Sequence, residues 1–566
     1  MLNTKFVSSL EKSFLDQSIN DFEALDRISA LRGERLSLQL LYAFDEDDKH
    51  NTTNYHTVKL SGKLAEHASV RSVKHLPVTK YEGQRNDRES LQECLRLPPN
   101  LFPDLLEPLA CGDILPICDK ILESLWIDIE IPEDFPSGES ELSLVISNVE
   151  GPVYKNKGDA IKVAESKIEI EVIGATLPEQ KLIHTEWFYT DCLANYYDTP
   201  VWSERHWEII ENYARVAQKN GINMLLTPVF TPPLDTAVGW ERVTTQLIGI
   251  KKSGNRYTYN FKLLDRWIDM CDRVGIKYLE ISHLFSQWGA THAPKIMACV
   301  DGEYKQIFGW DTDAHGDEYK KFLRSFLKAF IKHMKARGDD TRCFFHVSDE
   351  PGAQQIENYK KSKKIVEGVL KDYIIMDALS SIDFYKKGVT KTPIPTTWHT
   401  MDFVEAGVPD LWTYYCGGCP GGYSSRMLAR PSASNRSIGM QMYKYNIVGF
   451  LHWGFNFYNT RGSLAPVNPL IDTSGDRWVP AGDTALVYPG FKGMPLESIR
   501  LLVFAEGLQD MRAMQLCESY YSHEKTVAAI EEALGHAADF DKSALTPSEI
   551  LAVRERINAM IKAAIR

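Results

Sequence analysis

Two adjacent acids, Asp349 and Glu350, are the residues whose types and spacing best suit catalysis. They follow the apolar run 343–347 (CFFHV), whose aromatic and β-branched residues and closing Pro-Gly predict a buried strand. Carboxyl groups this close raise each other's pKa, so one stays protonated near neutral pH while its neighbour is ionised. A general acid needs this condition. The tetrapeptide 348–351 (SDEP) is also typical of a helix start, and from these residues alone both interpretations stand.

The elements that would position this pair follow from the hydrophobic pattern after about residue 180. Strand-like runs alternate there with amphipathic helices, which is typical of parallel βα units. The helix candidates are 204–218, 263–274, 318–335, 355–370 and 434–445. The eight strand candidates are 182–189, 224–229, 276–281, 342–347, 373–378, 394–399, 411–415 and 448–453. Eight strands make a TIM barrel, and the acid pair then follows the fourth strand, on the face where barrel enzymes place their active sites.

Two further units are predicted to flank this barrel. Residues 1–178 carry β-like runs that alternate apolar with polar residues, which predicts an N-terminal β-sandwich domain. Residues 179–517 form the predicted (β/α)8 TIM-like barrel domain, so the fold class is α/β. Residues 518–566 show helical periodicity and predict a short α-helical C-terminal segment.

Aromatic and polar residues recur at the predicted strand ends. Aromatic faces suit a sugar ring and polar edges suit its hydroxyl groups, so together they predict a carbohydrate pocket. Each aromatic residue taken alone is more often part of a core, and the recurrence carries the prediction. The candidate substrate-binding residues are Trp187, His283, Trp288, Trp398, Tyr414, Tyr415, Trp453 and Asn456.

Charge and hydropathy limit the partners. The chain has 64 basic and 76 acidic residues and a net charge of -12, whereas nucleic-acid binding needs a basic surface. No secretory signal is visible, and no apolar run approaches the roughly 20 residues that span a bilayer. We therefore expect a cytoplasmic protein with a carbohydrate partner and neither nucleic acid nor membrane. The sequence leaves room for a homo-oligomer.

Neither a cofactor nor a metal is expected. Nucleotide-binding fingerprints such as the P-loop are absent from the sequence. Cys416 and Cys419 have the spacing of a metal or redox pair, but no second pair follows, and a glycine-rich pocket wall is the favoured interpretation. The histidines at 283, 292, 346 and 399 lack HExxH-type spacing, so hydrogen-bonding roles are favoured for them.

Segments spread over about 180–515 resemble the catalytic domain of glycoside hydrolase family 123. The resemblance starts at 184–188 (HTEWF) and includes the acid pair and 451–456 (LHWGFN). Its most specific part is the combination of 482–490 (GDTALVYPG) with 498–501 (SIRL). A β-sandwich before the barrel is also expected in that group.

The resemblance implies a retaining, exo-acting β-N-acetylgalactosaminidase that works by substrate assistance. In that scheme the substrate's own 2-acetamido oxygen attacks the anomeric carbon, and the protein supplies no nucleophile. Glu350 would protonate the leaving oxygen and then activate water. Asp349 would orient the acetamido group and stabilise the oxazolinium-like intermediate.

Positions of other residues suggest further roles within this scheme. The segment around Tyr414 and Tyr415 is placed to hydrogen-bond the acetamido carbonyl. Trp398 and Trp453 are the candidates for an apolar floor under the sugar. Arg500 is expected to form a structural salt bridge near the last barrel turn.

The chain also departs from the characterised enzymes of this family. It shows no export signal. The His-rich insert 283–295 does not map onto the family's acetamido pocket, and Glu506 stands where many relatives are expected to carry a basic residue. These departures bear on the N-acetyl specificity more than on glycoside hydrolysis.

Two alternatives remain open from the residues. A glycosidase acting on a plain sugar would use a carboxylate nucleophile, with Glu280 or Glu186 opposite Glu350. A non-catalytic carbohydrate-binding protein would keep the aromatic residues, while the acids would merely cap a helix. A carboxyl group about 5 Å from Glu350 across the pocket would favour the first of these alternatives.

Overall fold

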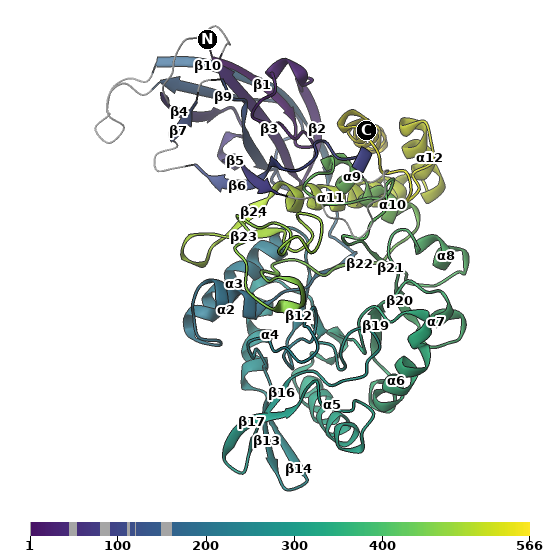
Figure 1. The fold of residues 1–566 in the computed structure, drawn as a ribbon. Helices are drawn as coiled ribbons and strands as arrows, with labels where there is room; N and C mark the ends of the chain where they lie inside the picture. Colours follow the sequence, from purple (N-terminus) through teal and green to yellow (C-terminus); the bar gives the residue numbers. More distant parts are fainter. Residues whose placement is uncertain are drawn as a thin grey trace.

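The computed structural model describes residues 2–44, 54–79, 91–109, 114–118, 120–148 and 161–565. Two N-terminal sheets and the C-terminal helices lie together at one end of the molecule, and a barrel lies at the other (Figure 1). Between them runs α11 (Ile499–Tyr520), whose residues are mostly buried. No helix in the described part of the chain is both long and apolar enough to cross a membrane.

The two N-terminal sheets share one apolar core. Leu38 and Leu40 of one sheet and Leu142 and Leu144 of the other lie in the same buried cluster. One sheet has the order β1 (Leu2–Ser8), β3 (Arg35–Phe44), β8 (Glu123–Glu130), β5 (Ala68–Val78), β6 (Asn100–Pro108), β24 (Pro495–Ser498) and β23 (Val487–Pro489). The other has the order β2 (Arg27–Arg32), β10 (Ile161–Thr176), β9 (Gly138–Asn148), β4 (Asn54–Ser61) and β7 (Ile114–Ile117). Alternate apolar residues along these strands face the shared core, as the two-residue period of a strand requires.

The barrel consists of eight parallel strands that follow one another around it in chain order. The strands are β11 (Ile183–Glu186), β12 (Met224–Thr227), β15 (Tyr278–Ile281), β18 (Cys343–Phe345), β19 (Ile374–Ala378), β20 (Thr392–Ile394), β21 (Trp412–Tyr414) and β22 (Gly449–His452). β22 pairs with β11, and a parallel bridge between Thr396 and Tyr414 joins the sixth strand to the seventh. The predicted barrel, the preceding sheets and the C-terminal helices are confirmed.

Helices cover the barrel between most of its strands. They are α2 (Thr190–Tyr196), α3 (Glu204–Lys219), α4 (Lys262–Val274), α5 (Asp317–Arg337), α6 (Ile356–Leu370), α7 (Asp383–Lys386), α8 (Thr400–Glu405), α9 (Ser432–Arg436) and α10 (Ile438–Lys444). Gly275 and Gly338 end α4 and α5 with φ values of +93° and +83°, a left-handed conformation that glycine adopts without strain. The chain thereby leaves each helix and enters the next barrel strand.

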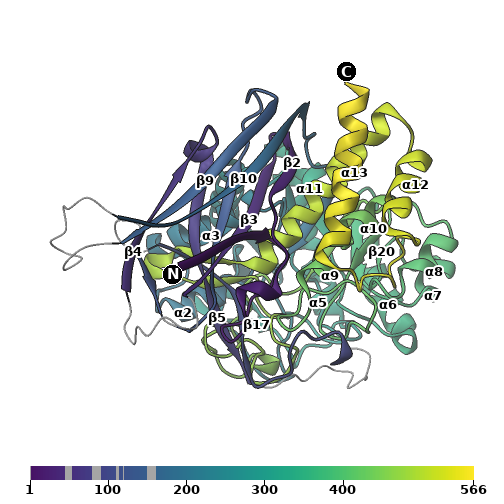
Figure 2. The ribbon, with the colours of Figure 1, turned by 90° about the horizontal axis from the view of Figure 1, so that it is seen from above.

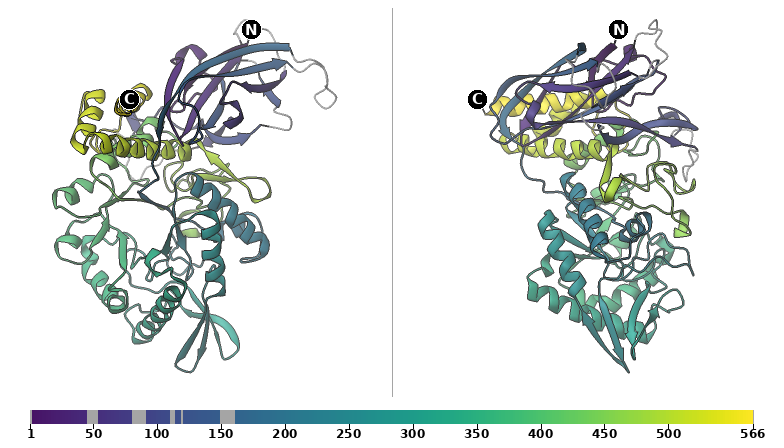
Figure 3. Two further views of the ribbon diagram at one scale, coloured as in Figure 1. Left: turned by 180° about the vertical axis from the view of Figure 1, so that it is seen from behind. Right: turned by 90° about the vertical axis from the view of Figure 1, so that its left-hand side faces the viewer.

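A small four-stranded sheet projects from the barrel at the end remote from the N-terminal sheets (Figures 1 and 3). Its strands belong to the loops that follow β12 and β15. They are β13 (Gly249–Ser253), β14 (Arg256–Asn260), β16 (Ile296–Val300) and β17 (Glu303–Phe308). The insert 283–295 leads from β15 into this sheet, so it belongs to a barrel loop at the carboxyl ends of the strands.

The chain after the barrel returns to the N-terminal sheets. β24 pairs with β6 through Glu497 and Ser498. Arg500 binds Asp104 of β6 through a buried ion pair at 2.9 Å, which is the structural kind of role expected for it. Glu506 accepts hydrogen bonds from Ser9 at 2.9 Å and lies 3.2 Å from Arg436, so it too connects the two parts of the molecule.

Two further helices complete the C-terminal part. α12 (His523–Leu534) and α13 (Pro547–Ala564) pack on each other and on α11. α13 also lies alongside β2 and β10 (Figure 2). Glu555 accepts hydrogen bonds from the backbone and hydroxyl of Ser29 there, at 2.8 and 2.6 Å.

Candidate active site

A cavity of about 440 Å³ opens at the carboxyl ends of the barrel strands. Both predicted acids, Asp349 and Glu350, line it. Most residues predicted to bind substrate also line it, namely Trp187, Trp288, Trp398, Tyr414 and Trp453. Because all the strands are parallel, the loops that follow them meet on one face, and residues distant in sequence share one pocket.

The acid pair lies in a turn and does not cap a helix. β18 ends at Phe345, and the 3-10 turn Ala353–Gln355 that leads into α6 has Gly352 as its N-cap. Glu350 has a φ of +42°, a left-handed conformation that is uncommon for a residue other than glycine and that concentrates at functional sites. Its N–H donates to the carbonyl of Ala378, at the end of β19, at 3.0 Å. The turn is therefore held by the neighbouring barrel strand.

Asp349 is buried in the cavity wall with only 5% of its surface exposed. The amide nitrogen of Gln287 donates to Asp349 Oδ2 at 2.8 Å, while Gln287 Oε1 accepts the N–H of Asp235 at 2.5 Å. The second bond fixes the orientation of the amide, so its NH2 group must face the acid. Burial and the nearby charge of Glu350 raise the pKa of Asp349 well above its usual value, and the hydrogen bond from Gln287 opposes that rise.

Glu350 projects into the cavity from its mouth, where the residue is exposed to solvent. The Tyr414 hydroxyl donates to Glu350 Oε1 at 2.5 Å. Desolvation of the carboxyl among the cavity walls raises the pKa of Glu350, and the hydrogen bond from Tyr414 lowers it. Asp349 and Glu350 therefore have different hydrogen-bond donors. Two carboxyl groups that share one proton need such different surroundings if each is to have its own role.

Two further acids line the same cavity, Asp235 after β12 and Asp483 after β22. Burial, with the charges of Glu350 and Asp483 nearby, raises the pKa of Asp235 to about 7. Burial raises the pKa of Asp483 to about 6. Asp483 Oδ2 accepts hydrogen bonds from the N–H of Gly417 at 2.9 Å and from the indole of Trp453 at 3.1 Å.

Tryptophans form much of the remaining wall. The rings of Trp453 and Trp478 lie 5.5 Å apart, and both side chains reach the cavity. Trp288, on the insert 283–295, is 54% exposed, and its N–H donates to the carbonyl of Asp349 at 3.0 Å. Aromatic faces together with carboxylate acceptors can hold a sugar ring by its faces and its hydroxyl groups.

Three residues predicted to contact substrate lie outside the cavity lining. His283 is buried and stacks on His346 with ring centres 4.2 Å apart. The Tyr415 hydroxyl donates to Asn435 at 2.8 Å, away from the acids. The side chain of Asn456 bonds the backbone N–H and carbonyl of Tyr189, so it connects two strand ends.

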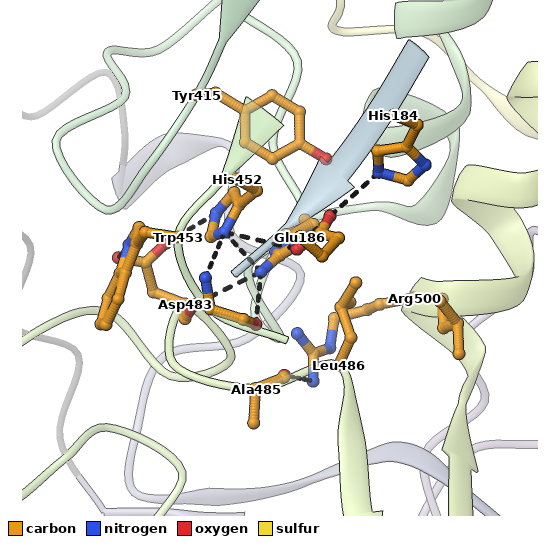
Figure 4. Close-up of polar contacts among 12 residues, drawn as sticks. His184, Glu186, Tyr415, His452, Trp453, Asp483, Ala485, Leu486 and Arg500 are labelled. Carbon is orange, nitrogen blue, oxygen red and sulfur yellow. Dashed lines mark hydrogen bonds and ion pairs between the residues drawn. The ribbon is translucent and has the colours of Figure 1, made fainter. Parts of the chain in front are cut away.

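Glu186 and Glu280 are fully buried and also lie outside the cavity lining. Glu186 binds Arg426 at 2.8 and 2.9 Å and contacts His184 at 3.3 Å, and Figure 4 shows it within a polar network that also contains His452 and Asp483. Glu280 accepts hydrogen bonds from the Trp187 indole at 2.8 Å, from His346 at 2.7 Å and from Thr185. Both carboxylates are engaged in the barrel interior.

One group in the described part of the chain has the proximity for a metal. The ligand atoms of His283, His346 and Asp377 lie within 4.8 Å of one another. However, both ring nitrogens of His346 face carboxylates, and its ring lies 17° from parallel to that of His283. Lone pairs in two stacked ring planes do not converge on one ion, so this arrangement suits hydrogen bonding better than metal binding.

Sequence patterns missed Gln287, Asp235 and Asp483 as site residues. Gln287 comes from the His-rich insert, which thereby supplies part of the cavity wall. Cys416 and Gly417 form another part of this wall. The Cys419 thiol donates to the Ser424 carbonyl at 3.3 Å. Asp235 comes shortly after the second predicted strand, 224–229, and Asp483 lies within the segment 482–490 that carries the family resemblance, and these positions were the available signals for them.

Comparison with known proteins gives one family. A family model described as glycoside hydrolase 123, catalytic domain, matches residues 187–517. Among solved structures, a family 123 glycoside hydrolase from Clostridium perfringens, described in connection with glycolipid glycan hydrolysis, matches with a TM-score of 0.73 at 16% identity. This match covers 99% of this chain and 98% of that chain. At this identity the likeness bears on the fold.

Other solved structures resemble the chain much less. A family 5 mannosidase from Rhizomucor miehei gives a TM-score of 0.32 at 12% identity, covering 58% of this chain and 94% of its own. A putative β-galactosidase from Bacteroides fragilis gives 0.30 at 9% identity, covering 84% and 58%. Scores this low support no argument. The search of the curated proteins gave no match.

Proposed function

The chain belongs to glycoside hydrolase family 123, which makes it a glycosidase with a carbohydrate substrate, and on this premise we propose a retaining, exo-acting hydrolase of a β-linked, GalNAc-like N-acetylhexosamine. Catalysis would be assisted by the substrate's acetamido group. The observation that carries this proposal is the adjacent pair Asp349 and Glu350 in one cavity, each with its own hydrogen-bond donor.

Each acid has a separate part in the proposed reaction. Glu350 gives its proton to the glycosidic oxygen while the acetamido oxygen attacks the anomeric carbon from the opposite side, and the bond to the leaving group breaks. An oxazolinium ion results. Glu350 then takes a proton from water, which attacks the same carbon and restores the acetamido group with the original anomeric configuration. Asp349 stabilises the positive charge throughout.

Electrostatics support this division of roles. Desolvation in the cavity raises the pKa of both acids, which favours one proton held between them in the free enzyme. Glu350 at the mouth is accessible to the leaving group, whereas Asp349 is nearly enclosed. Positive charge that develops on the sugar beside Asp349 favours the ionised form of that carboxyl, so the one proton of the pair lies on Glu350 when the leaving group departs.

The engagement of Glu186 and Glu280 also supports assistance by the substrate. A carboxylate nucleophile must reach the anomeric carbon from the cavity. Glu186 is instead bound to Arg426, and Glu280 is bound to Trp187 and His346. Neither side chain lines the cavity.

The decisive experiment replaces Glu350 with Gln. We expect the Glu350→Gln enzyme to fold normally and to lose at least about 1000-fold in kcat on an aryl β-N-acetylgalactosaminide, because the proton donor is gone. The matched control is Glu357→Gln on the exposed face of α6, which should keep full activity. Retained activity in the Glu350 variant would end the proposal.

Substrate choice tests the mechanism separately. An aryl β-galactoside that lacks the acetamido group should be cleaved at least about 1000-fold more slowly, because the attacking oxygen is missing. Proton NMR of the first-formed sugar should show the β-anomer. Equal cleavage of both glycosides, or a first-formed α-anomer, would contradict substrate-assisted retention.

A further inference from the structure

The turn that carries the acid pair depends on a buried carboxylate one strand away. We infer that Asp377, the penultimate residue of β19, is a positioning residue for Asp349 and Glu350, and that it acts both through the backbone of the turn and through His346. This inference rests on the proposed function for its kinetic consequence, but its structural part stands on geometry alone.

The first step concerns the backbone. The β18 and β19 strands pair as far as Phe345 and Ile375, and there the ladder ends. The N–H groups of Val347 and Ser348, just beyond the ladder, donate to the Asp377 carboxylate at 3.0 and 3.2 Å instead of to a neighbouring strand carbonyl. The Asp377 carboxylate thereby supplies the acceptors that a neighbouring strand would otherwise provide, and the chain can leave the sheet directly before the acids.

The residue after Asp377 continues this support. The carbonyl of Ala378 accepts the N–H of Glu350, the residue with a φ of +42°. The Asp377 carboxylate and the Ala378 carbonyl together therefore hold the turn on both sides of Asp349, through the N–H groups of Val347, Ser348 and Glu350. A left-handed conformation at a residue other than glycine persists where the surrounding contacts enforce it, and these hydrogen bonds do so for Glu350.

The second step concerns charge. Asp377 also accepts a hydrogen bond from the Tyr359 hydroxyl and contacts Nδ1 of His346 at 3.2 Å, while Nε2 of His346 contacts Glu280 at 2.7 Å. All these groups are buried. Burial disfavours the imidazolium, but the bonds to Asp377 and Glu280 outweigh it and raise the pKa of His346 to about 9.

The His346 cation in turn acts on the acid pair. It lowers the pKa of Asp349, against the larger effects of burial and of Glu350 that raise it. The titratable or charged groups that face His346 are Asp377 from β19, Glu280 from β15, and the stacked His283 from the loop after β15. Burial lowers the pKa of His283, so it adds no second positive charge.

An Asp377→Asn enzyme tests the inference. Asparagine has the same shape, but its NH2 group replaces one acceptor oxygen, and the N–H of Val347 contacts both oxygens of the carboxylate, at 3.0 and 3.3 Å, so the turn has to shift. We expect kcat to fall about 100-fold with KM within threefold of the wild type, because the reacting groups are displaced while the sugar-binding walls stay. Loss of the Asp377 charge should also lower the pKa of His346. Without the His346 cation the pKa of Asp349 should rise, so the acid limb of kcat/KM should move to higher pH by about one unit.

Tyr359→Phe is the matched control. It removes a hydrogen bond to the same carboxylate but leaves the negative charge and the bonds to Val347 and Ser348. We expect its kcat to stay within threefold of the wild type and its acid limb to remain in place. Equal losses in the two variants, or a folded Asp377→Asn enzyme with wild-type kcat and pH profile, would overturn the inference.

A spectroscopic readout separates this inference from the proposed function. In 15N-histidine-labelled protein at pH 7, His346 should give the signals of an imidazolium, assigned by their loss in His346→Gln, and Asp377→Asn should convert them to those of a neutral ring. A neutral His346 in the wild type overturns the inference whatever the enzyme hydrolyses. If Asp377→Asn fails to fold, His346→Gln takes its place, with the same upward shift of the acid limb expected and an unshifted limb counting against the inference.

Discussion

Removal of the Tyr414 hydroxyl should move the pH range in which Glu350 can act as an acid. The hydroxyl donates to Glu350 Oε1 at 2.5 Å and favours the ionised carboxylate. A hydrogen bond to a charged group contributes about 1.5–3 kcal/mol, and the lower value applies here because Glu350 is open to solvent. Since 1.36 kcal/mol corresponds to one pKa unit, Tyr414→Phe should raise the pKa of Glu350 by about one unit.

The sign of the effect on activity follows from the role of Glu350. A general acid works while it is protonated, so kcat/KM falls as the pH rises through its pKa. In Tyr414→Phe this basic limb should shift to higher pH by about one unit. Initial rates on an aryl N-acetylhexosaminide across pH 5 to 9, at substrate concentrations well below KM, would measure it.

The neighbouring residue provides the control. The Tyr415 hydroxyl bonds Asn435 and lies outside the cavity lining, so Tyr415→Phe should cost about 1 kcal/mol of stability and leave the limb in place. A limb that stays in place or moves to lower pH in Tyr414→Phe would refute the assignment of Glu350 as the acid. A shift of equal size in both variants would show that the effect is not local.

Three further substitutions have definite expected outcomes. Glu186→Gln leaves the buried Arg426 without its charge partner, so urea unfolding should show a loss of about 3 kcal/mol, and azide should not restore activity because no nucleophile was removed. Trp453→Ala removes an aromatic wall and should raise KM about tenfold with a smaller effect on kcat, as measured by steady-state kinetics. In Gly417→Ala the new methyl group would lie 2.7 Å from Pro480 Cδ and 2.8 Å from Asp483 Oδ2, so the displaced carboxylate should release the indole of Trp453 and produce a similar rise in KM, with a loss of stability of about 1–3 kcal/mol.

The barrel could be predicted because each of its strands is a short apolar run between helices of clear periodicity. The least accurate strand is the sixth, predicted at 394–399 and observed as β20 (Thr392–Ile394). Pro395 follows this strand directly, and Trp398, the one apolar residue in the remainder of the predicted strand, lines the cavity. The helix predicted at 434–445 is divided into α9 and α10 around Ser437.

Pairing between distant segments had no local signal. β23 and β24 extend an N-terminal sheet although almost 400 residues separate Glu497 from Leu106, its partner in β6. A strand pattern indicates that one face is buried but not which strand lies beside it. The contribution of the chain after the barrel to the N-terminal sheets was therefore not predictable from periodicity.

The same distinction applies to the candidate site. The acid pair and the tryptophans stand directly after apolar runs, so the barrel rule located them. Gln287 and Asp235 lie in loops without periodicity and meet through one hydrogen bond across 52 residues. Asp377 was part of a predicted strand, but its hydrogen bonds to the turn depend on the register between β18 and β19, which the sequence does not state.

The two unpredicted acids in the cavity also bear on the choice between mechanisms. With Glu186 and Glu280 engaged elsewhere, a carboxylate nucleophile would have to be Asp235 or Asp483 among the acids that line the cavity with the pair. A nucleophile must be ionised, and burial raises the pKa of Asp235 to about 7, so this acid is partly protonated near neutral pH.

Asp483 is constrained because its Oδ2 atom already accepts hydrogen bonds from Gly417 and Trp453. The backbone N–H of Asp235 and the carboxylate of Asp349 bond the same Gln287 side chain. The two carboxylates are therefore near neighbours and would repel each other if both were ionised. The acids suit the binding of hydroxyl groups better than nucleophilic attack, which supports the proposal that the substrate's own acetamido oxygen is the nucleophile.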